Sequence, residues 1–170
     1  MNNHRLFYRM LPLVGVIAWA IVGAPPALGA GDESIVVILN NSNPVDNLTT
    51  SEIRKLFLAE RSRWDTGKSV APVMPASGQA DRVAFLKIVC GMKEADFNKY
   101  FVQAAFTGKI VSPPKEVSSS RDVRSFVASS PGGVGFVRAS DLHGDASDGA
   151  IKTVKVDGLS PSDSGYKLKL

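Results

Sequence analysis

The stretch from Val70 to Phe85 constrains the fold of this chain most, because its hydrophobic pattern changes abruptly. The apolar run Val70–Met74 is typical of a buried strand, and Ser77-Gly78-Gln79 is typical of a turn. Apolar residues then recur at helical spacing. A strand that passes through a short turn into a helix is the building unit of α/β folds. The turn also gathers unpaired backbone N–H groups at a helix start, and such groups can hold an anion.

Two interpretations of this turn remain open from the residues alone. Ser77 is either the N-cap of the helix, a role worth about 1 kcal/mol, or a ligand for a bound anion. In the second case the N–H groups of Gly78 and Gln79 contribute, and Arg82, one turn into the helix, reaches the same spot. An arginine at that position is also typical of a helix surface.

The rest of the chain continues the alternation of strands and helices. Five apolar residues, Ile35–Leu39, predict a strand buried on both faces, as in a parallel sheet. Capping-box patterns at Thr49 and Ser119 predict helix starts, and a stripe of aromatic and small residues predicts a helix over 97–105 whose aromatics are core. Further strands are predicted over 134–137 and 151–156, with an edge strand over 166–170. This order predicts an α/β sandwich with a small sheet.

The first 29 residues have the layout of a secretory signal peptide. Arg5 and Arg9 precede the apolar run Met10–Val22, and small residues follow, so cleavage is expected after Gly29 or Ala30. A retained anchor is disfavoured because a spanning helix needs about 20 apolar residues. Residues 30–170 are expected to form one domain. Two of the 20 Lys and Arg and none of the 16 Asp and Glu lie in the signal, which leaves a net charge of +2.

The chain offers no set of residues for catalysis. Cys90 is the single cysteine and fits a helical core position, which excludes an internal disulfide and favours a bacterial periplasm. His143 is the single histidine after the signal, so a histidine-based metal site is not expected. Trp64 is expected to pack on the core. Basic residues do not cluster as nucleic-acid binding requires. We therefore expect no enzyme activity, no cofactor, no metal and no nucleic-acid partner.

Four motifs in one order resemble a known family, the phosphate-binding-protein branch of the type II periplasmic binding proteins, which serve bacterial ABC phosphate uptake. The similarity extends over most of residues 35–170. The matching residues are Leu48-Thr49, Glu52, Leu56-Phe57, Trp64, Asp65 and Gly67, then Ser77-Gly78, then Pro131-Gly132 and Val134-Gly135-Phe136-Val137.

The resemblance implies a periplasmic-binding-protein type II-like lobe in which Ser77 and Gly78 contact phosphate. Gln79 and Arg82 are added to the site by our own reasoning from the turn. Members of the family close two lobes on phosphate, whereas this chain resembles little more than one. The arginine that the family places four residues before the Ser-Gly pair corresponds to Val73, and its following threonine corresponds to Gln79.

Two functions from different classes follow. The first is a periplasmic protein that binds inorganic phosphate or a similar small oxyanion for ABC-type uptake or sensing, with an inner-membrane ABC permease or another periplasmic protein as its partner. The second is a non-catalytic periplasmic interaction module that kept the fold and lost the ligand. An open face without a second lobe would leave an anion exposed to water, which weakens each contact.

Overall fold

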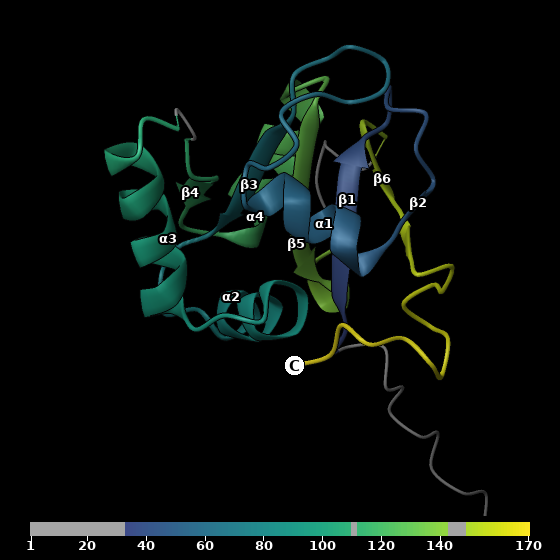
Figure 1. Cartoon of the computed structure of the whole chain (residues 1–170). Helices are drawn as coiled ribbons and strands as arrows, with labels where there is room; N and C mark the ends of the chain where they lie inside the picture. The colour runs from purple at the N-terminus through teal and green to yellow at the C-terminus, as the bar shows by residue number, and fades with distance from the viewer. Residues whose placement is uncertain (1–32, 110–111, 143–148) are drawn as a thin grey trace, which may run out of the picture.

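The computed structural model describes residues 33–109, 112–142 and 149–170 (Figure 1). The predicted signal peptide and His143 lie outside these residues. The helices are α1 (Thr50–Phe57), α2 (Ala80–Phe85), α3 (Glu94–Phe106) and α4 (Ser120–Ser129), with a π-helical segment η1 (Leu86–Cys90) and a 3₁₀ turn η2 (Ala139–Asp141). The strands are β1 (Ile35–Asn40), β2 (Asn47–Leu48), β3 (Ala71–Pro75), β4 (Lys115–Val117), β5 (Gly133–Arg138), β6 (Ile151–Thr153) and β7 (Lys155–Val156).

Five strands form a mixed sheet in the order β4-β3-β5-β1-β6, and β2 pairs with β7 in a small separate sheet. Strand β3 runs parallel to β4 and β5, while β1 runs antiparallel to β5 and β6. The predicted burial of β1 on both faces is therefore confirmed, but its expected parallel pairing is wrong. A central strand covered by helices on both faces is apolar throughout whichever way its neighbours run.

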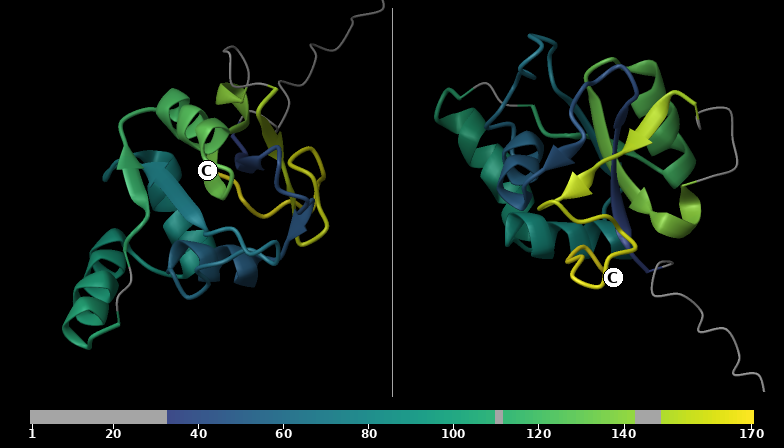
Figure 2. Two further views of the ribbon diagram at one scale, coloured as in Figure 1. Left: turned by 90° about the horizontal axis from the view of Figure 1, so that it is seen from above. Right: turned by 90° about the vertical axis from the view of Figure 1, so that its right-hand side faces the viewer.

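Alternate residues of β1 enter two separate cores. Ile35, Val37 and Leu39 pack with α1, α2, η1 and the inner face of α3, whereas Val36 and Ile38 pack under α4. The right-hand view of Figure 2 shows α1 (blue) and α4 (green) on opposite faces of the sheet. The first core is aromatic, with the rings of Phe85 and Phe136 stacked at 3.9 Å between centroids. This arrangement is the predicted α/β architecture, a small mixed sheet flanked by helices.

Local sequence signals correctly located the starts of α1 and α4. Thr49 caps α1 in a complete capping box with Glu52, and the Ser119 hydroxyl accepts a hydrogen bond from the Asp122 amide at the start of α4. Cys90 is buried and its pKa is raised to about 11 by burial, as expected of a small core residue. Trp64 is 2% exposed and donates its indole N–H to the Gly132 carbonyl at 3.0 Å, so it packs as predicted.

Two predictions about the last strands need correction. The strand expected over 151–156 is split at Val154, so β6 joins the large sheet and β7 pairs with β2. The tail over 166–170 is not an edge strand and makes only an isolated bridge at Lys169. Leu168 is fully buried and Tyr166 donates its hydroxyl to the Ile35 carbonyl at 2.8 Å, so the alternation reflects anchoring to the core.

Helix α3 stands at the side of the molecule (Figure 2). The aromatics Phe97 and Phe101 belong to the first core, as predicted, and Ala104 is also buried, while Val102 and Phe106 are exposed. Among the described ranges, no helix is both long and apolar enough to cross a membrane.

Candidate functional site

The predicted turn lies between β3 and α2, but Ser77 does not cap the helix. Gln79 is the N-cap residue, in an extended conformation and without a side-chain cap bond. Ser77 and Gly78 form a turn ahead of it, with Gly78 at φ +83°, a conformation that glycine adopts without strain. The N-cap interpretation of Ser77 is thus wrong. Helix α2 has only six residues before the chain passes into η1, so the turn and its neighbours define the site more than the helix does.

Ser77 and Gln79 have different surroundings. Ser77 is exposed, and neither its hydroxyl nor its amide has a hydrogen-bond partner among the described residues. Gln79 donates its side-chain amide to the Ser118 carbonyl at 3.1 Å, which fixes the turn to the segment between β4 and α4. Ser77 therefore presents free donors to solvent, whereas the Gln79 side chain holds the turn in place.

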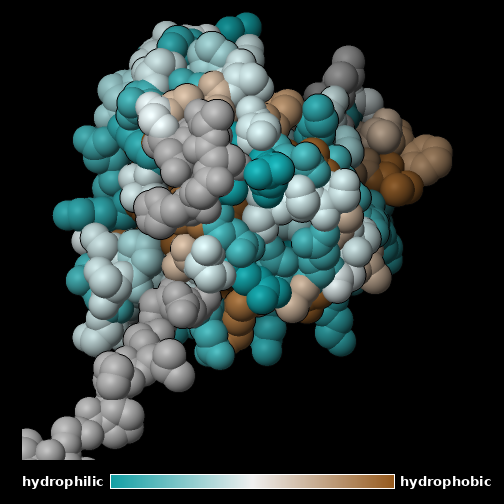
Figure 3. Space-filling model, turned by 180° about the vertical axis from the view of Figure 1, so that it is seen from behind, coloured by the Kyte–Doolittle hydropathy of each residue, from teal (hydrophilic) through white to brown (hydrophobic). Residues whose placement is uncertain are grey.

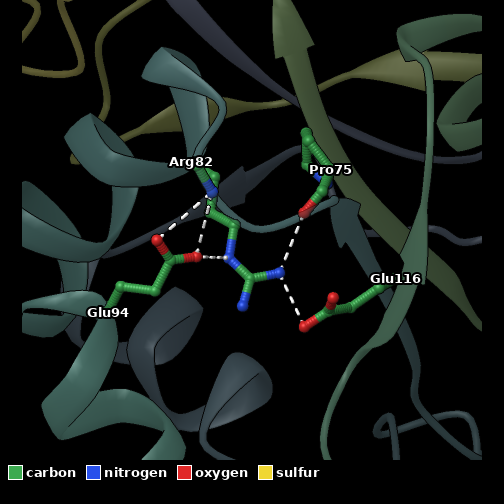
Figure 4. Close-up of polar contacts among 5 residues, drawn as sticks. Pro75, Arg82, Glu94 and Glu116 are labelled. Atoms are coloured by element: carbon green, nitrogen blue, oxygen red, sulfur yellow. Dashed lines mark hydrogen bonds and ion pairs between the residues drawn. The ribbon is translucent and has the colours of Figure 1, made fainter.

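Arg82 is the most unusual side chain of this region because it is 0% exposed. Its Nη1 donates to the Pro75 carbonyl at 3.0 Å and lies 2.7 Å from Glu116 Oε1, and its Nε lies 2.8 Å from Glu94 Oε1. Figure 4 shows the guanidinium between these two glutamates. The alternative of a surface arginine is wrong. Charged groups are buried only when paired, which the two carboxylates achieve here.

Glu94 joins the turn to the buried arginine. Its two carboxylate oxygens lie 3.3 and 3.2 Å from the Gly78 amide nitrogen and accept its hydrogen bond. The Glu94 carboxylate therefore contacts the Gly78 amide and the Arg82 guanidinium, the two groups that we predicted from the sequence to bind an anion. Of the four predicted site residues, the structure joins Gly78 and Arg82 through one carboxylate, and it leaves Ser77 and the Gln79 side chain outside that contact.

Part of the Arg82 guanidinium lacks hydrogen-bond partners among the described residues. Arg82 Nε approaches Glu94 without the alignment of a hydrogen bond, and the buried Nη2 has no hydrogen-bond partner among the described residues. Nε and Nη2 form one edge of the guanidinium, the kind of edge that binds an oxyanion through two parallel N–H groups. Glu94 occupies this edge only in part.

Val73, which the family resemblance aligns with an arginine, is fully buried in the second core with Val123 and Val127. The guanidinium beside this turn comes from Arg82 instead. Glu94 and Glu116 were missed by sequence reasoning because α3 and β4 bring them in from distant segments. No local pattern marks them, since an acidic residue in a first helical turn is ordinary.

Elsewhere in the described parts of the chain, no group of three or more His, Cys, Asp or Glu residues is placed to hold a metal ion. A polar groove lies between β4 and α4 and is lined by Lys115, Ser118, Asp122 and Ser125 among others. It includes Ser118, the contact of Gln79, and Glu116, the partner of Arg82.

No protein-family model matches the sequence. Solved structures match its fold. One is described as a putative phosphate ABC transporter substrate-binding protein from Clostridium perfringens with bound phosphate; it has a TM-score of 0.59 and 21% sequence identity, and the match covers 79% of this chain and 49% of that one. An ABC-type phosphate transport receptor from Vibrio cholerae matches similarly (0.59, 16%, 78% and 50%), as does PstS from Borrelia burgdorferi (0.57, 12%, 75% and 49%). The predicted resemblance is confirmed at the level of fold: the chain has a periplasmic-binding-protein type II-like fold and spans about half the length of these phosphate-binding structures.

Proposed function

We propose that this protein binds inorganic phosphate or a related small oxyanion at the Ser77-Gly78-Gln79 turn, with Arg82 as the charged ligand. The observation that carries the proposal is the Glu94 carboxylate, which lies on the Gly78 amide and the Arg82 guanidinium together. A carboxylate is itself an oxyanion, so the donors of the turn and the arginine already hold a group of the proposed chemical class. The free hydroxyl and amide of Ser77 add two donors at the surface.

The wider role follows from the resemblance and the names of the structural neighbours, which are phosphate-binding proteins of ABC transporters. We infer a periplasmic location after removal of residues 1–29, and a part in phosphate uptake or sensing with an ABC permease or another periplasmic protein as partner. Binding makes and breaks no covalent bond, so the proposal includes no enzyme activity.

The proposal is tested by calorimetric titration of the purified protein with phosphate, sulfate and acetate in low-salt buffer, together with thermal unfolding. A ligand that binds only the folded state at 100 times its dissociation constant stabilises that state by about 2.7 kcal/mol. We expect heat of binding and a raised unfolding temperature with phosphate. Absence of both with every anion would refute the proposal.

A matched pair of glycine variants tests whether phosphate binds at the Ser77-Gly78-Gln79 turn. Gly78→Ala strains the backbone at φ +83° and displaces the amide that faces Glu94, whereas Gly67→Ala imposes the same strain at φ +80° in another turn. A Cβ at either position meets no atom within 4 Å, so the two variants should lose similar stability, about 1 kcal/mol. Only Gly78→Ala should weaken phosphate binding. Equal weakening by both would move the binding away from this turn.

The second candidate is an interaction module in which ligand binding has been lost. It is favoured by the two glutamates that already compensate Arg82, and by Phe106, which is 87% exposed on α3. Figure 3 shows apolar residues at the edge of the molecule where α3 lies. Light scattering after size exclusion, and capture of partners from periplasm, test this function. A monomer that captures nothing and binds phosphate would exclude it.

A further inference from the structure

An oxyanion cannot reach Arg82 in the conformation described here. The arginine side chain is 0% exposed, and the side of its guanidinium that faces the turn is covered by Glu94. Glu94 is 26% exposed, lies at the first position of α3, and also accepts the hydrogen bond of the Gly78 amide. Any ligand that uses Gly78 and Arg82 together must therefore occupy the space that the Glu94 carboxylate fills.

We propose that Glu94 is a built-in competitor for the oxyanion site, a tethered carboxylate that occupies the donors of the turn until a ligand displaces it. This inference rests on the proposed function. Because the competitor is part of the chain, the apparent affinity equals the intrinsic affinity multiplied by the fraction of molecules in which Glu94 has left the site. Displacement also frees the N-terminal end of α3, so ligand binding is coupled to the position of that helix.

The geometry indicates that Glu94 can be displaced. Both carboxylate oxygens of Glu94 lie on the Gly78 amide, and only Oε1 also contacts the guanidinium, at Nε. The buried Nη2 is left without a hydrogen-bond partner among the described residues. An oxyanion with three or four oxygens can accept from the amide and from both nitrogens of the guanidinium edge. Such a ligand gains a hydrogen bond that the internal carboxylate does not make.

Glu116 is a suitable comparison because it contacts the same arginine in a different way. It lies 2.7 Å from Nη1, on the other side of the guanidinium, and makes no contact with Gly78 among the described residues. Its side chain is 48% exposed and comes from β4 rather than from α3. Removal of the Glu116 charge changes the electrostatic environment of Arg82 but leaves the Glu94 carboxylate on the Gly78 amide.

The test is calorimetric titration with inorganic phosphate of the wild type and four variants: Glu94→Gln, Glu94→Asp, Glu116→Gln and Asp96→Asn. Asp96→Asn removes the same charge from the same turn of α3, at an exposed position. We expect Glu94→Gln to lower the dissociation constant about tenfold, which corresponds to about 1.4 kcal/mol. Glu94→Asp keeps the charge but shortens the reach, so it should also tighten binding. Glu116→Gln should have a smaller effect, and Asp96→Asn should stay within about twofold of wild type.

Backbone amide NMR of Gly78 gives a second readout. Its resonance should move towards the same position in phosphate-saturated wild type and in the saturated Glu94 variants, because the amide then faces the same ligand. Circular dichroism establishes whether each variant is folded. If Glu94→Gln does not fold, Glu94→Asp still tests the proposal.

The outcomes distinguish the proposed role of Glu94 as a competitor from the proposed binding of phosphate. If wild type binds phosphate and neither Glu94 variant binds more tightly than Glu116→Gln, the competitor is refuted and the binding function stands. If only the Glu94 variants bind, the competitor is supported and phosphate binding by the wild-type protein is refuted. If no protein of the set binds phosphate, both fall.

Discussion

Removal of Glu94 and Glu116 together should destabilise the protein more than removal of Arg82, although all three belong to one cluster. The reason is their unequal burial: Arg82 is 0% exposed, whereas the glutamates are 26% and 48% exposed. Without Arg82 the carboxylates can turn to water. Without the carboxylates the guanidinium stays in the interior, and among the described residues it keeps the Pro75 carbonyl as its hydrogen-bond acceptor and the Phe97 ring at 5.8 Å.

The magnitudes follow from this difference. Removal of the partners of a buried charge costs about 3–5 kcal/mol, and we expect Glu94→Ala/Glu116→Ala to fall in that range. Arg82→Met keeps most of the side-chain volume and loses chiefly the hydrogen bond to Pro75, a loss of about 1–2 kcal/mol. The expected difference between the two variants is therefore about 2 kcal/mol, which is well above the error of a denaturation curve.

The assay is urea unfolding followed by the fluorescence of Trp64, which is buried on the core and becomes exposed on unfolding. The free energy of unfolding of each variant is compared at equal m-values. If Arg82→Met is destabilised as much as the double glutamate variant, then the arginine is not held by its counter-charges and this reasoning is wrong.

Two further predictions concern the core. Gly135→Ala should cost about 1–3 kcal/mol, because the new Cβ would lie 2.7 Å from Val123 Cγ1 and 3.0 Å from Val73 Cγ1; thermal unfolding measures the loss, and an unchanged midpoint would contradict it. Burial raises the pKa of Tyr166 well above its usual range, so this group stabilises the fold fully below about pH 10, its unfolded-state pKa, and loses that contribution as pH rises further. Tyr166→Phe should remove this part of the alkaline destabilisation, which urea curves between pH 8 and 11 would detect.

The elements that sequence reasoning located correctly are those specified by neighbouring residues. The caps at Thr49 and Ser119 depend on side chains three positions away. Strand direction is different. The residues of β1 are apolar on both faces whether their partners run parallel or antiparallel, so the pattern could not reveal that β5 and β6 run opposite to it.

Some residues of the candidate site could likewise be predicted from their neighbours in the sequence, and others could not. The turn around Gly78 and the arginine one helical turn later lie within six residues and could be joined by local reasoning. The carboxylates that fill the site come from Glu94 and Glu116, which only the packing of α3 and β4 brings to Arg82. Nothing in their own surroundings in the sequence separates them from solvent-exposed helix and strand residues.

The charges around Arg82 connect the two candidate functions. One guanidinium faces two carboxylates, so this cluster carries a formal charge of −1 before any ligand arrives. An added phosphate would bring further negative charge to a position that has no second cation among its contacts in the described residues, which is unfavourable unless one carboxylate leaves. An oxyanion-binding protein with this cluster therefore requires an exchange of anions, whereas an interaction module would keep Glu94 in place. The response of Glu94 to phosphate is the physical property that distinguishes the two functions.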